Sequence, residues 1–355
     1  MSTKMTIMTM PIERLENPHP HPAFAKVCAA LDALHIDLGD QCRVVDRLRA
    51  LVERGPRKHI LVIEGPGGVG KTRSIDVANG TIQSMEVAAL PVNICRVRCT
   101  GTTNASVLGE LICLDLRVPP SGLGNPARLA SYIQIQMPKK GRQLLIVDNS
   151  HFLDQEGRSG EGVLRILGSV IASGAASVAL VGRENTSAIG KRLKEVVAQT
   201  MEVVTVEPLK YENGQDLDAI KAFLGLLADG LKPALAGSGV ELKLHTDDMA
   251  KRFWAGAWGV EGLMITLVLE TLRAVLEGPA LQTSSYLIGK DDFAEAWRVF
   301  AASETPLTFN PFSRHDAPTL GEIEQARARV KQKAEEQNSV VLPKAPRGPG
   351  ARIWS

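Results

Sequence analysis

The stretch Gly65-Pro66-Gly67-Gly68-Val69-Gly70-Lys71-Thr72 decides the fold of this chain. It has the spacing glycine, four residues, then Gly-Lys-Thr. It follows an apolar run of strand length, residues 59–64, and opens a helical pattern that extends to about residue 79. Glycines let the backbone wrap closely around phosphate oxygens with its N–H groups pointing inward. The pattern predicts a loop that binds a nucleoside triphosphate; the alternative is a glycine-rich turn without a ligand.

Two side chains of this loop have expected roles. Lys71 can reach the outer phosphates of a bound nucleotide, and the hydroxyl of Thr72 can ligate Mg²⁺. Arg73 follows directly and completes the set, residues 65–73, that we expect to contact the nucleotide. The expected cofactors are ATP and Mg²⁺.

A second signature is the apolar run Leu144-Leu145-Ile146-Val147, which ends in Asp148. In P-loop enzymes an aspartate at this place holds Mg²⁺, across the sheet from the threonine of the loop. An apolar strand that ends in aspartate is weak evidence alone, but here it follows Thr72 by 76 residues, one strand pair later. We therefore expect Thr72 and Asp148 to form the metal site.

The residue after Asp148 bears on catalysis. Many P-loop ATPases of the AAA+ group have glutamate here, which polarises the attacking water, whereas this chain has Asn149. An amide can orient water but cannot take its proton, so we expect slow hydrolysis or a displaced base. Glu184, just past the apolar run 177–181, is a candidate for that base. A solvated loop carboxylate is the favoured alternative.

Polar and basic residues follow the same run. Arg183 or Asn185 could face the γ-phosphate as a sensor. Arg192, flanked by Lys191 and Lys194, is the expected arginine finger, which would reach the nucleotide of a neighbouring subunit. The alternative for these three residues is a basic helical surface without that role.

Contact with nucleic acid must come from local basic patches, because the formal net charge is only +2. Basic residues expected near the helices after the second strand could neutralise DNA phosphates: Arg117, Arg128, Lys139, Lys140 and Arg142. Such charges often serve only solubility. Aromatic residues make up 4% of the chain, which argues against base stacking and favours duplex over single-stranded DNA.

The composition bounds the class of protein. Hydrophobic residues at 44% and charged residues at 23% are typical of a soluble globular protein of this length, 355 residues. The five cysteines form no CxxC pair, and their odd number favours a reducing compartment. No stretch approaches the roughly 20 apolar residues of a membrane span, and residues 1–11 lack a signal-peptide core. We therefore expect a cytoplasmic protein.

Five apolar runs of strand length alternate with helical segments between residues 60 and 206. This order predicts an α/β fold with a parallel five-stranded sheet covered on both faces. After Pro208 four segments have helical spacing with no strand between them, which indicates a small all-helical lid module. The expected parts are an N-terminal arm with two helices at 1–55, the P-loop domain at 56–208, the lid at 209–304, and a charged helix with a flexible tail at 305–355.

Two features of the lid can be interpreted from the sequence. Trp254 and Trp258 flank a glycine-containing helix end and are expected to be core residues. A lid of the AAA+ type often presents a basic side chain to the nucleotide. Here the expected position holds Glu261 or nearby apolar residues instead.

The chain resembles the TniB/TnsC family of transposition AAA+ ATPases, which is related more distantly to the Mu B protein. The matching segments are Pro20-His21-Pro22-Ala23-Phe24, residues 65–72, LLIVDNSHFL at 144–153, Leu180-Val181-Gly182, Gly259–Gly278 and Asp291-Asp292-Phe293. The resemblance covers about residues 20 to 302.

This resemblance implies a protein that assembles on duplex DNA as an ATP-bound ring or helical filament. Such proteins link a target-selecting factor, in some systems an RNA-guided one, to the transposase. Lys71, Thr72 and Asp148 are then the functional core, and Asn149 departs from the family's usual glutamate. The segment after Thr305 becomes a region for partner binding, with Asn310-Pro311-Phe312 either a docking motif or a simple turn.

Two other functions share the same nucleotide core. A helicase-loader-type AAA+ protein should engage a replicative helicase through its N-terminal arm. A STAND-like signalling switch would be a nucleotide-gated scaffold with no DNA role. The short helical module and the lack of a downstream repeat array argue against the STAND-like switch.

Overall fold

The computed structural model describes residues 21–36, 38–55, 58–84, 86–87, 90–91, 93–120, 125–154, 157–197, 200–212, 214–278, 285–302 and 307–339. Most of the expected N-terminal arm, up to residue 20, lies outside these residues. So do Thr305, where the expected C-terminal part begins, and the expected tail from residue 340.

A parallel sheet forms the centre of the larger part of the chain. Its strands are β1 (His59–Glu64), β4 (Asn93–Arg98), β5 (Arg142–Asp148), β6 (Ser177–Gly182) and β7 (Thr200–Thr205), in the order β4-β5-β6-β1-β7. Every neighbouring pair is parallel, so each strand must return through a crossover connection. The predicted α/β fold with a five-stranded parallel sheet is confirmed.

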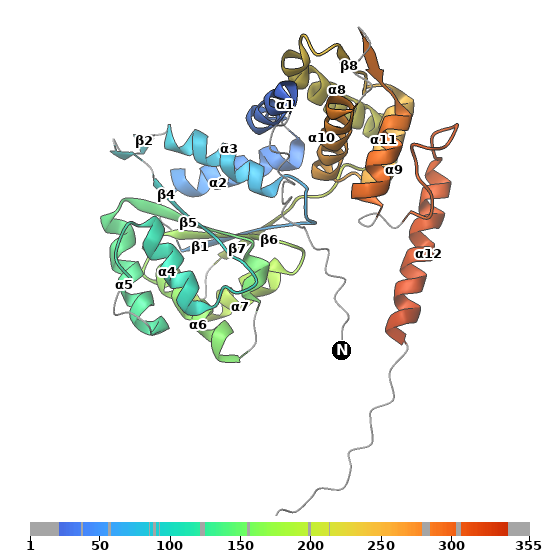
Figure 1. Cartoon of the computed structure of the whole chain (residues 1–355). Coiled ribbons are helices and arrows are strands. Elements are labelled where there is room, and N and C mark those ends of the chain that lie inside the picture. The colour runs from blue at the N-terminus through green and yellow to red at the C-terminus, as the bar shows by residue number, and fades with distance from the viewer. Residues whose placement is uncertain are drawn as a thin grey trace, which may run out of the picture.

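Helices cover both faces of the sheet, because successive residues of the central strands β1, β5 and β6 are apolar and buried on both sides. α2 (Gly39–Glu53) and α3 (Lys71–Gln83) pack on one face with Leu61 and Ile63 of β1. The opposite face carries Ile60 and Val62. It is covered by α4 (Ala105–Asp115), α5 (Pro126–Lys139), α6 (Gly157–Ala172) and α7 (Thr186–Val197). Figure 1 shows the two helix layers above and below the sheet.

A second, mainly helical part follows the sheet and is called the lid below. It contains α8 (Gly214–Leu235), α9 (Asp247–Ala257), α10 (Glu261–Glu277), α11 (Lys290–Ala296) and the turn η3 (Trp297–Ala301). A final helix, α12 (Leu320–Ser339), begins at the outer side of the lid and projects away from it (Figure 1). Trp254 is buried in the lid core, as expected, and its indole N–H donates to the carbonyl of Leu209.

Two short strand pairs were missed by the sequence prediction. β8 (Val240–Leu242) and β9 (Tyr286–Ile288) pair in parallel within the lid, and β2 (Glu86–Val87) and β3 (Leu90–Pro91) form an antiparallel pair before β4. Strands of two or three residues are too short for a period of two to be recognised. The lid is therefore helical apart from one small strand pair.

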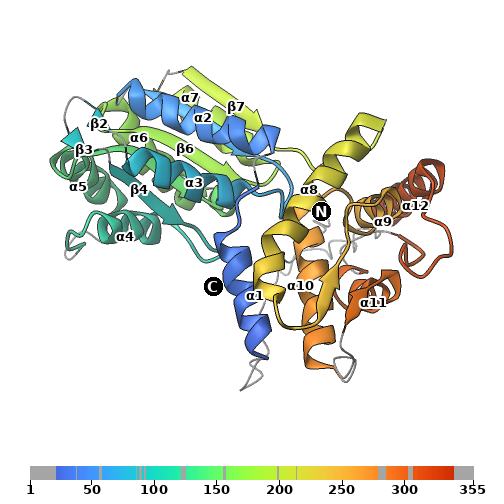
Figure 2. The ribbon, with the colours of Figure 1, turned by 90° about the horizontal axis from the view of Figure 1, so that it is seen from above.

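The two helices expected before the glycine-rich loop pack in different places. α1 (Pro22–Ala33) lies against α8 and α10 of the lid, and its Val27 is fully buried there. α2 instead lies on the sheet beside α3. The connection between α1 and α2 therefore crosses from the lid to the sheet, as Figure 2 shows from above.

The segment that follows residue 307 packs into the lid. Phe312 is fully buried, with its ring centroid 5.3 Å from that of Phe253 and 5.7 Å from that of Phe293. The interpretation of Asn310-Pro311-Phe312 as a docking motif is wrong, because the side chain that would dock is part of the lid core. Asn310 makes a turn instead: its Oδ1 accepts a hydrogen bond from the N–H of Phe312.

Arg252 holds this segment in place. Its side chain is 1% exposed and donates to the carbonyl oxygens of Pro311, Arg314 and His315 at 2.7 to 2.9 Å. The guanidinium also pairs with Asp248 at 2.7 Å. A buried charge needs such a complete set of partners, so this arginine fixes the path of the chain into α12.

Among the described residues, none of the helices combines the length and the apolar character needed to cross a bilayer.

We expect Phe312→Ala to destabilise the lid by about 3 to 5 kcal/mol, because it empties a site between two buried rings. Urea unfolding monitored by tryptophan fluorescence would measure the change. Phe300→Ala is the matched control: this ring is 41% exposed, and its truncation should cost less than about 1 kcal/mol. Equal losses for the two variants would contradict the buried position of Phe312.

Candidate nucleotide site

The glycine-rich loop leaves the end of β1 in a conformation that excludes side chains. Gly65 and Gly70 have φ values of 154° and 78°. A Cβ at Gly65 would lie 2.1 Å from the carbonyl oxygen of Val206, and one at Gly70 would lie 2.2 Å from the side-chain amide of Gln41. Only glycine permits these approaches, so the loop backbone is held open as a cradle of N–H groups.

Lys71 begins α3 and folds back over the loop. Its Nζ donates to the carbonyl oxygens of Gly65, at 2.8 Å, and Pro66. Burial lowers the pKa of Lys71 to about 8, and the nearby carboxylate of Asp148 opposes that shift. The ammonium group thus lies within the loop, where phosphate oxygens can take the place of its carbonyl partners.

The chain brings Thr72 and Asp148 together from 76 residues apart. The hydroxyl of Thr72 donates to Oδ2 of Asp148 at 3.4 Å, and the aspartate is only 2% exposed. A hydroxyl and a carboxylate are oxygen donors, the ligands that Mg²⁺ prefers, so this pair fits the expected metal. In the described part of the chain, no group of three or more His, Cys, Asp and Glu residues could hold another ion.

Two arginines of the neighbouring strand also face Asp148. Arg96 and Arg98 lie on β4, and their guanidinium groups approach Oδ2 of Asp148 at 3.3 and 3.5 Å. Arg96 pairs in addition with Asp76 of α3. The sequence analysis did not assign these arginines to the site. Their spacing of two residues on a strand, which puts both on one face, is the signal that it overlooked.

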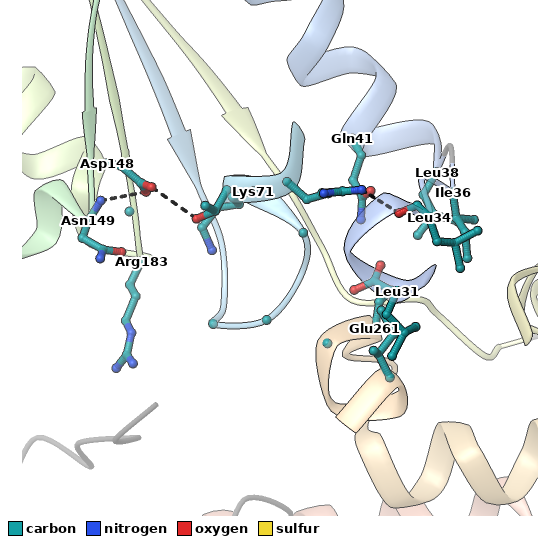
Figure 3. Close-up of a pocket in the computed structure, with 18 of the residues that line it drawn as sticks. Leu31, Leu34, Ile36, Leu38, Gln41, Lys71, Asp148, Asn149, Arg183 and Glu261 are labelled. Atoms are coloured by element: carbon teal, nitrogen blue, oxygen red, sulfur yellow. Dashed lines mark hydrogen bonds between the residues drawn. The ribbon is translucent and has the colours of Figure 1, made fainter. Parts of the chain in front are cut away.

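Asn149 has a left-handed backbone, with φ 57°. Its N–H donates to Oδ1 of Asp148 at 2.9 Å, and its side-chain amide donates to the carbonyl of Cys99 at 3.4 Å. One N–H of the amide is therefore held by the carbonyl of the residue that follows β4. Asn149 nevertheless lines the cavity next to Asp148 (Figure 3).

The lid touches the loop directly. The N–H of Gly262, in the first turn of α10, donates to the carbonyl of Gly68 at 2.9 Å. A Cβ at Gly262 would lie 2.8 Å from that same oxygen, so the helix can come this close only with glycine there. The start of α10 therefore forms one wall of the nucleotide site.

A cavity of about 510 Å³ lies between the loop, the sheet and the lid. One end is polar, with Lys71, Thr72, Asp148, Asn149 and Arg183. The other end is apolar and is formed by α1, the connection to α2 and the lid: Leu31, Leu34, Ile36, Leu38, Phe223 and Ile265. Figure 3 shows the leucine side chains across the loop from Lys71 and Asp148. A polar pocket for phosphates that continues into an apolar pocket suits a nucleotide.

Arg73 supports the apolar end of the cavity. Its guanidinium donates to the carbonyl oxygen of Leu34 at 2.8 Å, which ties the connection between α1 and α2 to the start of α3. The residue also lines the cavity. Arg73 therefore shapes the pocket through its contact with the main chain of Leu34.

His151 is a cavity residue that the sequence analysis missed. It lies in the turn η1 (Ser150–Leu153), and its Nδ1 is buried without a hydrogen-bond partner in the described structure. Burial, with the charges of Arg183 and Lys71, lowers the pKa of His151 to about 4. The imidazole is thus neutral at pH 7. Its position three residues after Asp148 was the available signal.

Glu261 lies in the cavity wall at the first residue of α10. It is 5% exposed, and its Oε2 is buried without a hydrogen-bond partner among the described residues. Burial raises the pKa of Glu261 to about 7, Asp40 adds to the rise, and Lys71 opposes it. The position expected to hold a basic lid residue thus carries a buried acid.

The other candidate catalytic residues lie outside the cavity. Glu184 is exposed in the loop after β6 and does not line the cavity, although its charge reaches Lys71. Arg192 lies on α7, about one-third exposed, with its guanidinium 3.5 Å from Asp154. Whether Arg192 reaches the nucleotide of a second subunit stays a prediction.

The five basic residues expected to contact DNA lie on α5 or directly after it, just after α4, and at the start of β5. Arg128 lies in the first turn of α5 and Lys139 in its last, which separates them by roughly 16 Å along the helix. Arg117, Lys139 and Lys140 are exposed. Arg142 is instead engaged within the domain: it donates to the carbonyl oxygens of Ile94 and Asp115 and faces the carboxylate of Asp115 at 3.4 Å.

Comparison with known proteins agrees with this geometry. Residues 54–189 match the family described as the AAA domain. Cdc6p of Pyrobaculum aerophilum has a similar fold, with a TM-score of 0.54 and 12% identity, covering 84% of this chain and 87% of that protein. The Aeropyrum pernix ORC2 protein has a similar fold as well, with a TM-score of 0.51 and 14% identity, and the match covers 75% of this chain and 68% of that protein. No curated protein matches the sequence. Residues 54–189 thus resemble an AAA domain, and the TniB/TnsC resemblance stays a prediction.

We expect Glu261→Gln to remove a pH dependence of stability. The folded carboxyl has a pKa of about 7 against 4.5 in the unfolded chain, so the folded state binds its proton more tightly. The parent therefore loses stability as pH rises from about 4.5 to 7, by about 3 kcal/mol in all. The free energy of unfolding of the variant should exceed that of the parent at pH 8 and equal it near pH 4.5.

Urea unfolding of both nucleotide-free proteins at several pH values measures this difference. His151, with its lowered pKa, changes stability with the opposite sign over part of the same range, but it is present in both proteins and cancels. If the difference in stability between parent and variant is the same at every pH in this range, the pKa of the Glu261 carboxyl is not raised by burial.

Proposed function

We propose that this chain is an ATP-binding protein of the AAA+ type whose nucleotide state controls its assembly on DNA. The observation that carries the proposal is the convergence of Lys71, Thr72 and Asp148 in one cavity beneath the lid. The structure of the ORC2 protein was solved as ADPNP–ADP complexes, which supports the choice of an adenine nucleotide for this fold.

Different residues would bind the phosphates, the Mg²⁺ ion and the base of the nucleotide. The backbone of the loop and Lys71 would hold the phosphates, and Thr72 with Asp148 would hold Mg²⁺. The apolar residues of α1 and the lid would receive the base. When bound, Mg²⁺ would supply positive charge to the phosphates. Arg96 and Arg98 place positive charge beside Asp148 but do not line the cavity themselves.

We further propose that hydrolysis is slow. A general base must reach the attacking water, and the side chain at the usual position is an amide engaged with Cys99. Glu184 is exposed outside the cavity, which favours the interpretation of a solvated loop carboxylate. The ATP state would then be long-lived, as suits a switch.

The biological role rests on the sequence resemblance to TniB/TnsC proteins. We propose that the ATP-bound chain assembles on duplex DNA as a ring or filament and links a target-selecting protein to a transposase. Exposed Arg117, Arg128, Lys139 and Lys140 are available for phosphate contacts. Arg192 would reach the nucleotide of the next subunit. ATP and five cysteines outside any disulfide are in keeping with a protein of the cytoplasm.

Sedimentation with duplex DNA tests the proposal. We expect the chain to co-sediment with DNA in the presence of ATP and Mg²⁺ and to stay in the supernatant without nucleotide. Lys71→Ala should abolish the ATP effect, since it removes the charge on the outer phosphates. Lys243→Ala, an exposed lysine on the lid, is the matched control and should behave as the parent. If the chain co-sediments with DNA equally with and without ATP, the proposal that nucleotide controls assembly is wrong.

Restoring a carboxylate should speed hydrolysis. We expect Asn149→Glu to raise the rate of phosphate release at least about 10-fold, because it supplies a base beside Asp148. Glu184→Gln is the paired variant and should hydrolyse ATP at the parent rate, since Glu184 lies outside the cavity. A large loss in Glu184→Gln would instead identify Glu184 as the displaced base.

A further inference from the structure

The first turn of α10 is fixed against the glycine-rich loop. The hydrogen bond from Gly262 to Gly68 and the absence of room for a Cβ at Gly262 leave the helix start little freedom. Glu261, the residue before Gly262, is therefore held in the cavity wall at a defined place. Its position is a property of the backbone and does not depend on a flexible loop.

Glu261 carries an acceptor that the described chain leaves unused. The carboxylate accepts a hydrogen bond from its own backbone N–H, yet Oε2 is buried with no partner. The side chain is 5% exposed. Burying an unpaired carboxylate oxygen is costly, and buried polar groups in proteins nearly always have partners. A donor from a bound molecule is the missing partner that the cavity admits.

The place of Glu261 indicates which part of a nucleotide would supply that donor. In Figure 3 the carboxylate of Glu261 lies between the loop that carries Lys71 and the apolar side chains of Leu31 and Leu34. A carboxylate repels phosphate oxygens, and it binds hydrogen-bond donors rather than the apolar face of a base. Between the triphosphate and the base of a nucleotide lies the sugar, whose hydroxyl groups are donors.

We propose that Oε2 of Glu261 accepts a hydrogen bond from the nucleoside part of the nucleotide, from a ribose hydroxyl or, as the second source, from the exocyclic amine of adenine. Glu261 is then a specificity residue, for the ribose or for adenine, in place of the basic lid residue common in AAA+ proteins. This inference rests on the proposed ATP site.

Nucleotide affinities of the parent and two variants test the assignment. The ligands are ATP, 2′-deoxy-ATP, 3′-deoxy-ATP and purine riboside triphosphate, which lacks the amine, each measured by calorimetry. The titrations are made at pH 8, above the pKa of about 7, so that Glu261 is mostly ionised, and a hydrogen bond to a charged acceptor is worth about 10-fold or more in affinity. We therefore expect the parent to bind at least one analogue about 10-fold more weakly than ATP.

The ratio of affinities for ATP and the analogue is the decisive quantity. Glu261→Ala should bring this ratio close to one, whether its affinity for ATP itself rises or falls, since both ligands then lack the contact. Glu261→Gln retains an acceptor without the charge and should give an intermediate ratio. Glu241→Ala, at an exposed glutamate of β8 outside the cavity, should keep the parent ratio. Binding of ATP by each variant shows that it is folded.

The outcomes separate this inference from the proposed function. The 2′- and 3′-deoxy analogues identify a ribose hydroxyl as the donor, and the purine analogue identifies the amine. A parent that binds ATP but discriminates against none of the analogues overturns the role of Glu261 and leaves the ATP site intact. An unchanged ratio in Glu261→Ala also overturns it. A parent that binds no ATP overturns the proposed function together with the inference.

Discussion

Three parts of the fold press on the backbone of the glycine-rich loop where no side chain fits. Val206 after β7 approaches Gly65, Val260 before α10 approaches Gly68, and Gln41 of α2 approaches Gly70. Each contact occupies the space of a Cβ, with a main-chain oxygen at Gly65 and side-chain atoms at Gly68 and Gly70. Packing thus supports the loop conformation, and a nucleotide bound in the loop would also lie against the lid.

Several charged side chains of the cavity lie at its polar end. Lys71 and Arg183 line its polar end, and Arg96 and Arg98 compensate the buried carboxylate of Asp148 from the neighbouring strand. Glu261 places an acid between the phosphate end and the apolar end, and its Oε2 has no hydrogen-bond partner among the described residues. A buried carboxylate oxygen without a partner reduces stability unless a ligand supplies one.

The sequence allowed the sheet and the polar end of the site to be predicted in advance. Apolar runs and the glycine spacing are local patterns, and they led to β1, to β5 and to the pair Thr72–Asp148. The docking interpretation of Phe312 failed, since burial of that ring depends on Phe253, about sixty residues earlier in the chain. Packing of α1 on the lid was missed for the same reason, because its partners are remote in sequence. The strand pair β8–β9 was missed because its strands are too short for their period to be recognised.

By itself, therefore, the sequence determined the α/β fold, the phosphate-binding loop and the identity of its lysine, threonine and aspartate, because each of these is specified by neighbouring residues along the chain. Only the tertiary structure decided the rest. It showed the side-chain amide of Asn149 bonded to Cys99, two arginines beside Asp148, and Glu261 unpaired in the cavity wall. These features depend on distances between segments far apart in the chain, which packing sets and local patterns do not encode.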